Sequence, residues 1–194
     1  VSWMPDNSGF FYSRFDEPKE GEAFVAKNLY QKLYFHRLGT PQDQDVLVYE
    51  RPDEPEWGIY GGVTEDGRYL AIYISTGATT QNRFYYRDLK APFAAPVRLI
   101  DEFVADFTLI GNDGKHMYFR TDYQAPKGRV IKIDLASPEK ENWVEVIPER
   151  ETTLRWVNWV GGQRVCGYLE DACSKIKVHS IAGDFLRDVE LPGI

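Results

Sequence analysis

The sequence predicts an all-β fold made of repeated four-stranded antiparallel sheets, as in a β-propeller. A turn motif containing glycine recurs four times along the chain. Short segments rich in β-branched and aromatic residues lie between clusters of Gly, Pro, Asn and Asp, which is typical of strands joined by tight turns. No stretch combines a 3.6-residue apolar period with helix caps. Four antiparallel strands in a unit of about 45–50 residues are typical of a propeller blade.

The four copies of the turn motif are recognisable in the sequence. The motif appears as WMPDNSGFFYS (3–13), VTEDGRYLAIYIS (63–75), LIGNDGKHMYFRT (109–121) and VGGQRVCGYLE (160–170). Its turn glycines are Gly9, Gly67, Gly114 and Gly162. A second landmark recurs with a similar spacing at Leu38, Leu89, Leu135 and Ile181. Two independent markers with one period indicate a structural repeat.

Each repeat is expected to contribute up to four strands, in chain order. First strands are expected at 59–64, 106–110 and 154–160, and the first repeat lacks this strand apart from 1–3. Second strands are expected at 10–14, 69–75, 116–121 and 164–170. Third strands are expected at 32–38, 83–89, 130–135 and 175–181. Fourth strands are expected at 45–50, 96–100, 143–147 and 185–191.

The expected blades span approximately 1–50, 59–102, 104–149 and 154–191, within one partial propeller domain over 1–194. Propellers usually close with more blades, so the chain is expected to be an arc of a larger ring. An arc has open strand edges, through which a second chain could pair. The sequence starts at Val1 without a Met, which also suggests a piece of a longer protein.

Composition limits the classes of partner. The chain has 194 residues, of which 43% are hydrophobic and 14% aromatic, enough for a packed core. Its formal net charge of -7 argues against a nucleic-acid partner, because phosphate binding needs a concentrated basic patch. No apolar run approaches the roughly 18 residues of a membrane span. We therefore expect neither nucleic acid nor membrane as a partner.

The two cysteines, Cys166 and Cys173, flank an expected hairpin turn near Asp171. Strand pairing about that turn would place Cys166 opposite Lys177 rather than opposite Cys173, so we expect no disulfide. Two reduced thiols suit a cytoplasmic protein, with the periplasm as the alternative.

Catalytic and metal-binding motifs are not found in the sequence. No serine has glycines at both flanking positions as in G-x-S-x-G. All three histidines fall in expected strands, and His36 and His179 share a repeat position with Arg87 and Ile133, which indicates a structural use. No zinc-ligand spacing or nucleotide-binding glycine loop is present. We therefore expect no catalytic residue, no metal and no cofactor in this chain.

The connection between Arg14 and Lys32 is much longer than its counterparts in the other repeats. Long loops in compact domains are often functional, although a tolerated surface insertion is the alternative.

The stretch NLYQKLYFHRLGTPQDQDVLVYERPDEPEWG (28–58) resembles the N-terminal propeller of the prolyl oligopeptidase family. The family's N-L-x-Q-K-L-Y-x-H-x-L-G-T pattern is present from Asn28 to Thr40. Further matches are Pro55–Trp57, Glu65–Tyr69 and Asn82–Leu89, and the resemblance runs from Trp3 to the end of the chain.

The resemblance implies a seven-bladed propeller that caps an α/β-hydrolase domain absent from this chain. Such serine endopeptidases cleave short peptides on the carboxyl side of proline, and their triad lies in the hydrolase domain. The propeller then limits access to the site, and this chain alone is expected to be inactive. Its implied partners are short proline-containing peptides and the hydrolase domain of the same full-length chain.

The resemblance also implies particular residues. The substrate-cavity wall would include Phe11, Ser75 and Ala78, and Ser75 and Ala78 stand where some members have arginine and cysteine. A gating loop would include Glu17, Lys19, Glu20, Gly21, Lys27 and Asn28.

Two other readings stay open. The chain could be a stand-alone propeller that binds peptides or proteins without enzymatic activity. A less favoured idea is another enzyme class with its site in the central channel of a propeller.

Overall fold

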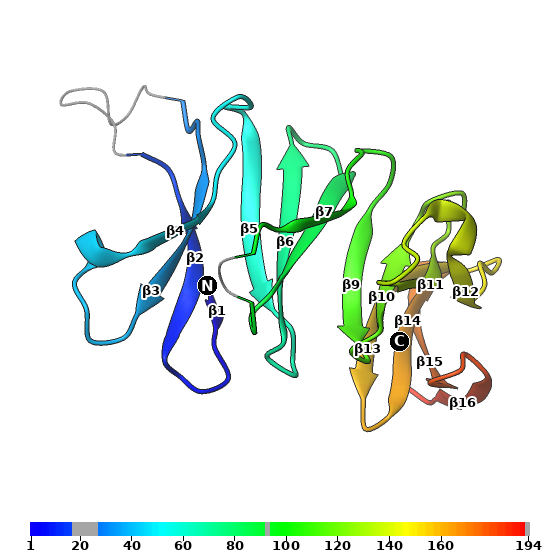
Figure 1. Cartoon of the computed structure of the whole chain (residues 1–194). Coiled ribbons are helices and arrows are strands. Elements are labelled where there is room, and N and C mark those ends of the chain that lie inside the picture. Colours follow the sequence, from blue (N-terminus) through cyan, green and yellow to red (C-terminus); the bar gives the residue numbers. More distant parts are fainter. Residues whose placement is uncertain (17–26, 92–93, 193–194) are drawn as a thin grey trace. The chain divides into compact units, whose positions relative to one another are not determined.

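The computed structural model of the chain describes residues 1–16, 27–91 and 94–192. Within them the chain forms two compact units, Val1–Phe103 and Val104–Ile194, each made of two four-stranded antiparallel sheets (Figure 1). Every sheet is a meander in which strands adjacent in sequence are also adjacent in space. The predicted all-β propeller fold class is confirmed. No helix in the described part is long and apolar enough to cross a membrane.

The first unit contains two sheets. The strands of the first sheet are β1 (Ser2–Trp3), β2 (Gly9–Arg14), β3 (Lys32–Arg37) and β4 (Val46–Tyr49). Those of the second sheet are β5 (Trp57–Val63), β6 (Tyr69–Thr76), β7 (Asn82–Asp88) and β8 (Val97–Ile100). The β5 strand starts two residues before the expected Ile59, because Trp57 still pairs with Thr76 of β6. A 3₁₀ turn, η1 (Gln42–Gln44), precedes β4.

The glycine of the first repeat does not have the role that the repeat predicts. Gly67, Gly114 and Gly162 have positive φ angles of 69°, 87° and 75°, as tight turns require. In the first repeat the left-handed residue is Asn7, with φ 56°. Gly9 instead opens β2, where a Cβ would lie 2.2 Å from the His36 carbonyl oxygen. Glycine is therefore needed for a tight turn in three repeats, and for a close approach between two backbone segments in the first repeat.

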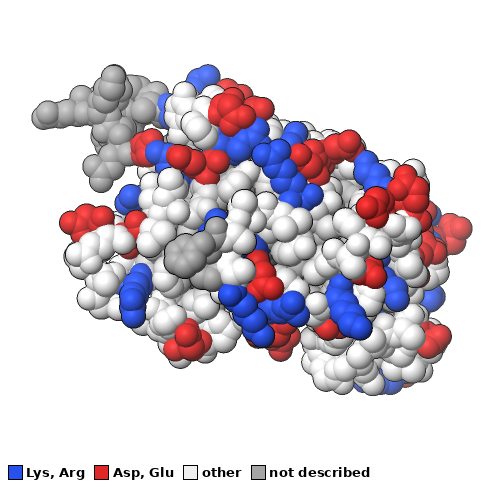
Figure 2. All heavy atoms as spheres, in the orientation of Figure 1, with Lys and Arg blue, Asp and Glu red and all other residues white. Residues whose placement is uncertain are grey.

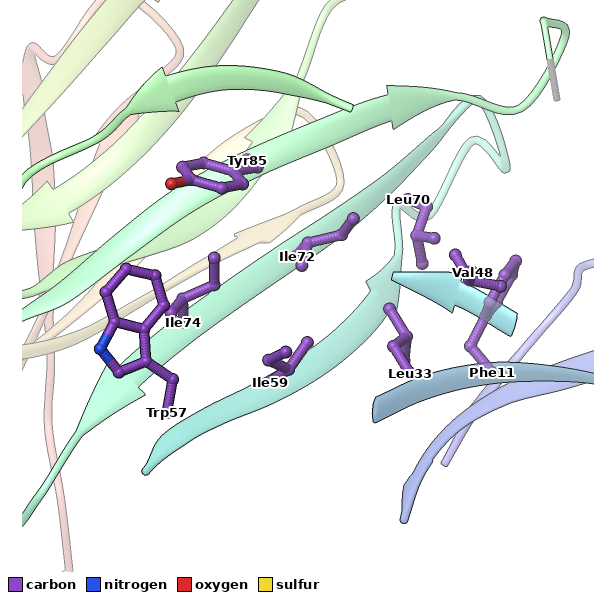
Figure 3. Packing of buried hydrophobic residues seen from close by; sticks show 9 residues of the cluster. All are labelled: Phe11, Leu33, Val48, Trp57, Ile59, Leu70, Ile72, Ile74 and Tyr85. Carbon is purple, nitrogen blue, oxygen red and sulfur yellow. The ribbon is translucent and has the colours of Figure 1, made fainter. Parts of the chain in front are cut away.

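The core of the first unit lies between its two sheets. β6 turns Leu70, Ile72 and Ile74 to this core, and all three are fully buried. Figure 3 shows Phe11 toward the Leu70 end of β6 and Trp57 toward the Ile74 end. Burial of each such side chain stabilises the fold by about 1.5–3 kcal/mol. Tyr69 and Ala71 are buried as well, so the first half of β6 is covered on both of its faces.

The second unit also contains two sheets. The third sheet consists of β9 (Phe107–Asn112), β10 (His116–Thr121), β11 (Arg129–Asp134) and β12 (Val144–Ile147), with the 3₁₀ turn η2 (Lys140–Asn142) before β12. The fourth sheet consists of β13 (Thr153–Val160), β14 (Gln163–Glu170), β15 (Cys173–Ser180) and β16 (Phe185–Val189). A buried cluster joins them, made of Val130, Ile147, Leu154, Val157, Cys166 and Tyr168.

The β14–β15 hairpin confirms the expected placement of the cysteines. Its turn residues Asp171 and Ala172 both have positive φ, at 46° and 62°, which is the backbone pattern of a type I′ turn. Cys166 pairs with Lys177, whereas Cys173 pairs with Glu170. Both thiols are free.

Candidate functional site

The long connection between β2 and β3 is fixed where it joins the first sheet. Asp16 precedes the undescribed residues, and Lys32 opens β3. The Lys32 ammonium lies 2.7 Å and 2.8 Å from the two carboxylate oxygens of Asp16. The Asp16 side chain is 59% exposed and that of Lys32 21%, so this is a surface pair that closes the stem of the connection.

The downstream end of the connection is also attached to the second sheet. The Tyr30 amide donates to the Pro55 carbonyl oxygen at 2.7 Å, and Tyr30 adopts an unusual left-handed φ of 59°. Gln31 is buried, and its Oε1 accepts a hydrogen bond of 2.7 Å from the Ile59 amide of β5. These two bonds hold residues 30–31 to the strand β5 and to the turn before it.

Two cavities border this stem. One has a volume of about 280 Å³ and is lined by residues of the stem and of the segment after β4, namely Asp16, Tyr30, Gln31, Lys32, Glu50, Arg51 and Pro52. The other has a volume of about 240 Å³ and lies at the start of β5 and the end of β6, lined by Lys27, Leu29, Glu54, Pro55, Glu56, Trp57 and Thr76. We call the stem and these two cavities the stem site.

Trp57 forms a wall of the smaller cavity, and Arg51, which stacks on it, lines the larger one. Trp57 is 7% exposed, and the guanidinium carbons of Arg51 and Arg83 lie 4.4 Å and 4.5 Å from its ring centroid. Phe103 packs against it edge-on, at 5.3 Å between ring centroids. Stacking of guanidinium groups on an indole is favourable and restricts the motion of all three side chains.

Carboxylates neutralise both stacked arginines. Arg51 donates to Asp53 through Nε at 2.8 Å and Nη2 at 2.7 Å, and these hydrogen bonds lower the pKa of the Asp53 carboxyl to about 2. Arg83 donates to Asp101 at 2.6 Å. Burial acts to raise the pKa of Asp101, but hydrogen bonds from Tyr85 and Arg83 outweigh it and lower the pKa. The wall therefore carries its charges as fixed pairs.

The residues expected from the family resemblance are partly brought together here. Lys27 and Asn28 are exposed at the end of the connection, and Lys27 lines the smaller cavity. Ser75 lies half-buried in β6 between Gly58 and Asn82, next to Thr76 of the same cavity. Ala78 is exposed in the turn after β6. Glu17, Lys19, Glu20 and Gly21 lie outside the described residues.

Phe11 is placed apart from Ser75. Its side chain is 5% exposed and lies in the core between the first two sheets, with its ring centroid 4.9 Å from that of Phe35. It packs toward the Leu70 end of β6, whereas Ser75 follows Ile74 at the other end (Figure 3). Five residues of a strand span about 17 Å. A cavity-facing role for Phe11 stays a prediction.

The stem site contains residues that the sequence did not single out. Asp16 and Gln31 act through contacts with residues distant in sequence, Lys32 and Ile59, which are 16 and 28 positions away. Arg51 contacts Asp53 and Trp57, which are near it in sequence. The one available signal was position, since Asp16 and Lys32 flank the unusually long connection.

The histidine–carboxylate pairs of the chain lie elsewhere. His36 Nδ1 is 2.7 Å from Asp45, whose other oxygen accepts a hydrogen bond from the Tyr12 hydroxyl. His116 Nδ1 is 3.0 Å from Asp113, which also accepts from the Tyr118 hydroxyl at 2.9 Å. In both pairs a phenol also donates to the carboxylate. The first arrangement joins β2 and β3 to the residue before β4, and the second joins β10 to the turn that precedes it. Among the described residues, no group of three or more His, Cys, Asp or Glu side chains could hold a metal ion.

The surface around these elements carries mixed charge. On the face shown in Figure 2, lysine and arginine side chains are interspersed with aspartate and glutamate. Neither sign of charge forms a single continuous patch on this face.

Comparison with known proteins identifies the family. A family model described as "Prolyl oligopeptidase, N-terminal beta-propeller domain" matches residues 1–194. The prolyl endopeptidase of Elizabethkingia miricola is 37% identical over 193 residues, covering 100% of this chain and 27% of that protein. Prolyl oligopeptidase A of Galerina marginata is 32% identical over 196 residues, covering 96% of this chain and 26% of that protein.

Comparison with solved structures also finds prolyl oligopeptidases and prolyl endopeptidases. Prolyl oligopeptidase B of Galerina marginata, bound to a 25mer macrocyclization substrate, superposes with a TM-score of 0.89 at 28% identity, covering 96% of this chain and 26% of that one. A structure from a study of two prolyl endopeptidases gives a TM-score of 0.86 at 28% identity, covering 99% and 27%. The chain thus spans about a quarter of the length of these relatives. It belongs to the prolyl oligopeptidase family, as part of the N-terminal β-propeller domain.

Proposed function

We propose that this chain is the substrate-limiting, non-catalytic part of a serine endopeptidase that cleaves short peptides on the carboxyl side of proline. The observation that carries the proposal is the stem site, where the long β2–β3 connection is attached at the same end of the unit as Ser75 and Thr76. The relatives support the peptidase context, since they are prolyl endopeptidases and prolyl oligopeptidases.

The physical role is access control. A peptidase site works best where water is excluded and donors are pre-arranged for the oxyanion. Rigid sheets limit the size of peptide that reaches such a site, and a loop anchored at its two ends can control entry. The hydrolase domain of the same full-length chain would be the partner that supplies the nucleophile, base and oxyanion hole.

A length series of peptides tests the proposal. In the full-length enzyme, deletion of 18–27 should change kcat/KM or the length at which peptides cease to be cleaved, while the propeller remains folded. A matched control is the deletion of 92–93, which shortens the β7–β8 connection instead. Identical length profiles for the first deletion and the unmodified enzyme would overturn the access role.

The chain alone is proposed to be inactive, because its chemistry would come from the hydrolase domain. A contaminant-free preparation of residues 1–194 should release no chromophore from a Gly-Pro substrate. Turnover proportional to the concentration of this chain, and resistant to further purification, would contradict this proposal.

A stand-alone peptide-binding module is the second candidate, and the two cavities of the stem site favour it. The two candidates differ in the mass of the native protein and in labelling by a serine-directed fluorophosphonate. A labelled protein several times larger than this chain supports the peptidase, whereas an unlabelled protein of propeller size supports the module. We also propose a cytoplasmic location, with the periplasm as the alternative. Fractionation of the source cells in the same experiment tests this location.

A further inference from the structure

The fourth sheet carries a buried cation and a buried histidine side by side, away from the stem site. Arg164 of β14 and His179 of β15 are paired in register, and both side chains are completely buried. The guanidinium carbon of Arg164 lies 4.5 Å from the ring centroid of Tyr118 in β10, a strand of the third sheet. The two residues therefore lie in the interface between the two sheets of the second unit.

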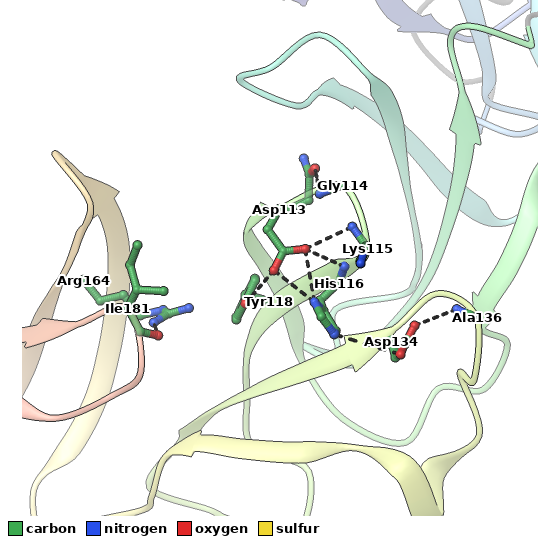
Figure 4. Close-up of polar contacts among 10 residues, drawn as sticks. Asp113, Gly114, Lys115, His116, Tyr118, Asp134, Ala136, Arg164 and Ile181 are labelled. Atoms are coloured by element: carbon green, nitrogen blue, oxygen red, sulfur yellow. Dashed lines mark hydrogen bonds and ion pairs between the residues drawn. The ribbon is translucent and has the colours of Figure 1, made fainter.

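Arg164 is held by rings and carbonyls rather than by a carboxylate. Its Nη1 donates to the carbonyl oxygens of Ser180, the last residue of β15, and of Ile181 in the turn after it. Figure 4 shows Arg164 beside Ile181. A second ring, that of Trp159, lies 5.0 Å from the guanidinium carbon. The Nε and Nη2 atoms are buried without a hydrogen-bond partner among the described residues. Burial lowers the pKa of Arg164, although its ordinary value is so high that it stays charged.

Among the residues that the structure describes, His179 has no hydrogen-bond acceptor to which an added proton could be donated. Within the described part of the chain neither ring nitrogen has a hydrogen-bond partner, and Phe185 of β16 packs edge-on against the imidazole at 5.9 Å. A register shift between Val178 and His179 interrupts the β15–β16 pairing at this point. A β-bulge of this kind weakens the local ladder of hydrogen bonds.

The charges that face His179 are mostly positive. Arg164 faces it from β14, Lys177 from β15 and Arg150 from the connection before β13, while Asp188 of β16 is the one carboxylate among them. Asp188 already forms an ion pair of 2.7 Å with Lys177. Burial, followed by the three cations, lowers the pKa of His179, and Asp188 opposes this effect.

We propose that Arg164 and His179 form an acid-sensitive switch, in which protonation of His179 puts a second cation beside Arg164 and releases β15 and β16 from the rest of the unit. The folded state disfavours the protonated imidazole, so opening takes up one proton. The free energy of opening therefore has its full value above the pKa of an exposed histidine, about 6.5. It decreases as the pH falls from there to the lower pKa that His179 has in the folded state. The opening constant should rise by up to about tenfold for each pH unit in that window.

Native-state hydrogen exchange followed by mass spectrometry tests the switch on residues 1–194. After correction for intrinsic exchange, amides of β15 and β16 should open more often as the pH falls from 7.5 to 5.0, with a slope approaching one proton. Amides of β6 in the other unit should not show this slope. A flat profile for β15 and β16 over this range would overturn the proposal.

Variants assign the effect to the two residues. His179→Phe should remove the slope, and Arg164→Met should reduce it, because the imidazole then titrates beside a neutral neighbour. His36→Gln is the matched control, which removes a histidine of the other unit and should leave the slope unchanged. A slope that persists in His179→Phe overturns the proposal. Should that variant fail to fold, an NMR titration of His179 in the unmodified chain decides, and a pKa at or above 6.5 overturns the switch.

Discussion

The Lys32 ammonium lies 2.7 Å from Asp16 Oδ1 and 2.8 Å from Oδ2, so two residues on either side of a long connection form one ion pair. The pair joins the end of β2 to the start of β3 at the point where the sheet itself stops pairing, since the last pair in register is Arg14 with Lys32. It extends the hairpin by one contact and fixes the distance between the two ends of the connection.

Removal of this pair should affect kinetics more than stability. Because Asp16 is 59% exposed, the pair is expected to contribute only about 0–1 kcal/mol to the free energy of unfolding. In the full-length enzyme, Asp16→Asn and Lys32→Met should leave Tm nearly unchanged and alter kcat/KM for long peptides relative to short ones. Glu151→Gln, which breaks the exposed pair with Lys127 in the other unit, is the control and should leave both quantities unchanged.

A shift in Tm of many degrees without any change in length preference would show that the pair is purely structural. The charge-reversed double variant, Asp16→Lys with Lys32→Asp, adds a further check. It should restore the length profile of the unmodified enzyme if the ion pair, rather than either residue alone, is responsible.

The buried hydrogen bond from the Ile59 amide to Gln31 should be important for stability. Gln31→Leu has a similar size but leaves the Ile59 N–H buried without its acceptor, which should cost about 1–3 kcal/mol. Urea unfolding of residues 1–194 measures this loss as a lower midpoint with an unchanged slope. Gln42→Leu removes an exposed glutamine that donates to Tyr12 at 3.2 Å and should change stability by less than about 0.5 kcal/mol. Equal losses in the two variants would contradict the assigned role of Gln31.

The sequence predicted the fold better than the stem site, for a physical reason. Strands such as β6 are specified locally, because a short run of apolar and aromatic residues from Tyr69 to Ile74 can be read from the sequence itself. The errors were at boundaries and in the role of Gly9, where pairing with another strand decides. The stem site depends on contacts such as that between Gln31 and Ile59, which appear only when two sheets pack together. No local pattern encodes such a contact.

Two glycines with similar backbone angles should tolerate alanine differently. Gly183 and Gly39 both have positive φ, at 101° and 84°. A Cβ on Gly183 would lie 1.9 Å from the Val146 carbonyl oxygen, whereas nothing lies within 4 Å of a Cβ on Gly39. Gly39→Ala should therefore cost about 1–2 kcal/mol from backbone strain alone. Gly183→Ala should cost distinctly more in the same urea experiment, because backbone must also move.

Equal costs for the two substitutions would mean that the turn before β16 relaxes freely. In that case the close approach of Gly183 to β12 contributes nothing to the attachment of the outer strands of the fourth sheet.

The two thiols should differ sharply in reactivity. Burial raises the pKa of Cys166 to about 11, so at pH 8 this thiol is both protonated and inaccessible. Cys173 is half-buried next to the β14–β15 turn and is open to reagent. Because the thiolate is the reactive form, a disulfide reagent at pH 8 should modify one thiol of the native chain quickly and the second only after unfolding. Cys173→Ser should abolish the fast phase, whereas Cys166→Ala should retain it. A fast phase that survives in Cys173→Ser would show that the sheet around Cys166 opens readily, and would remove the rigid packing that the fourth sheet needs to bury Arg164 and His179.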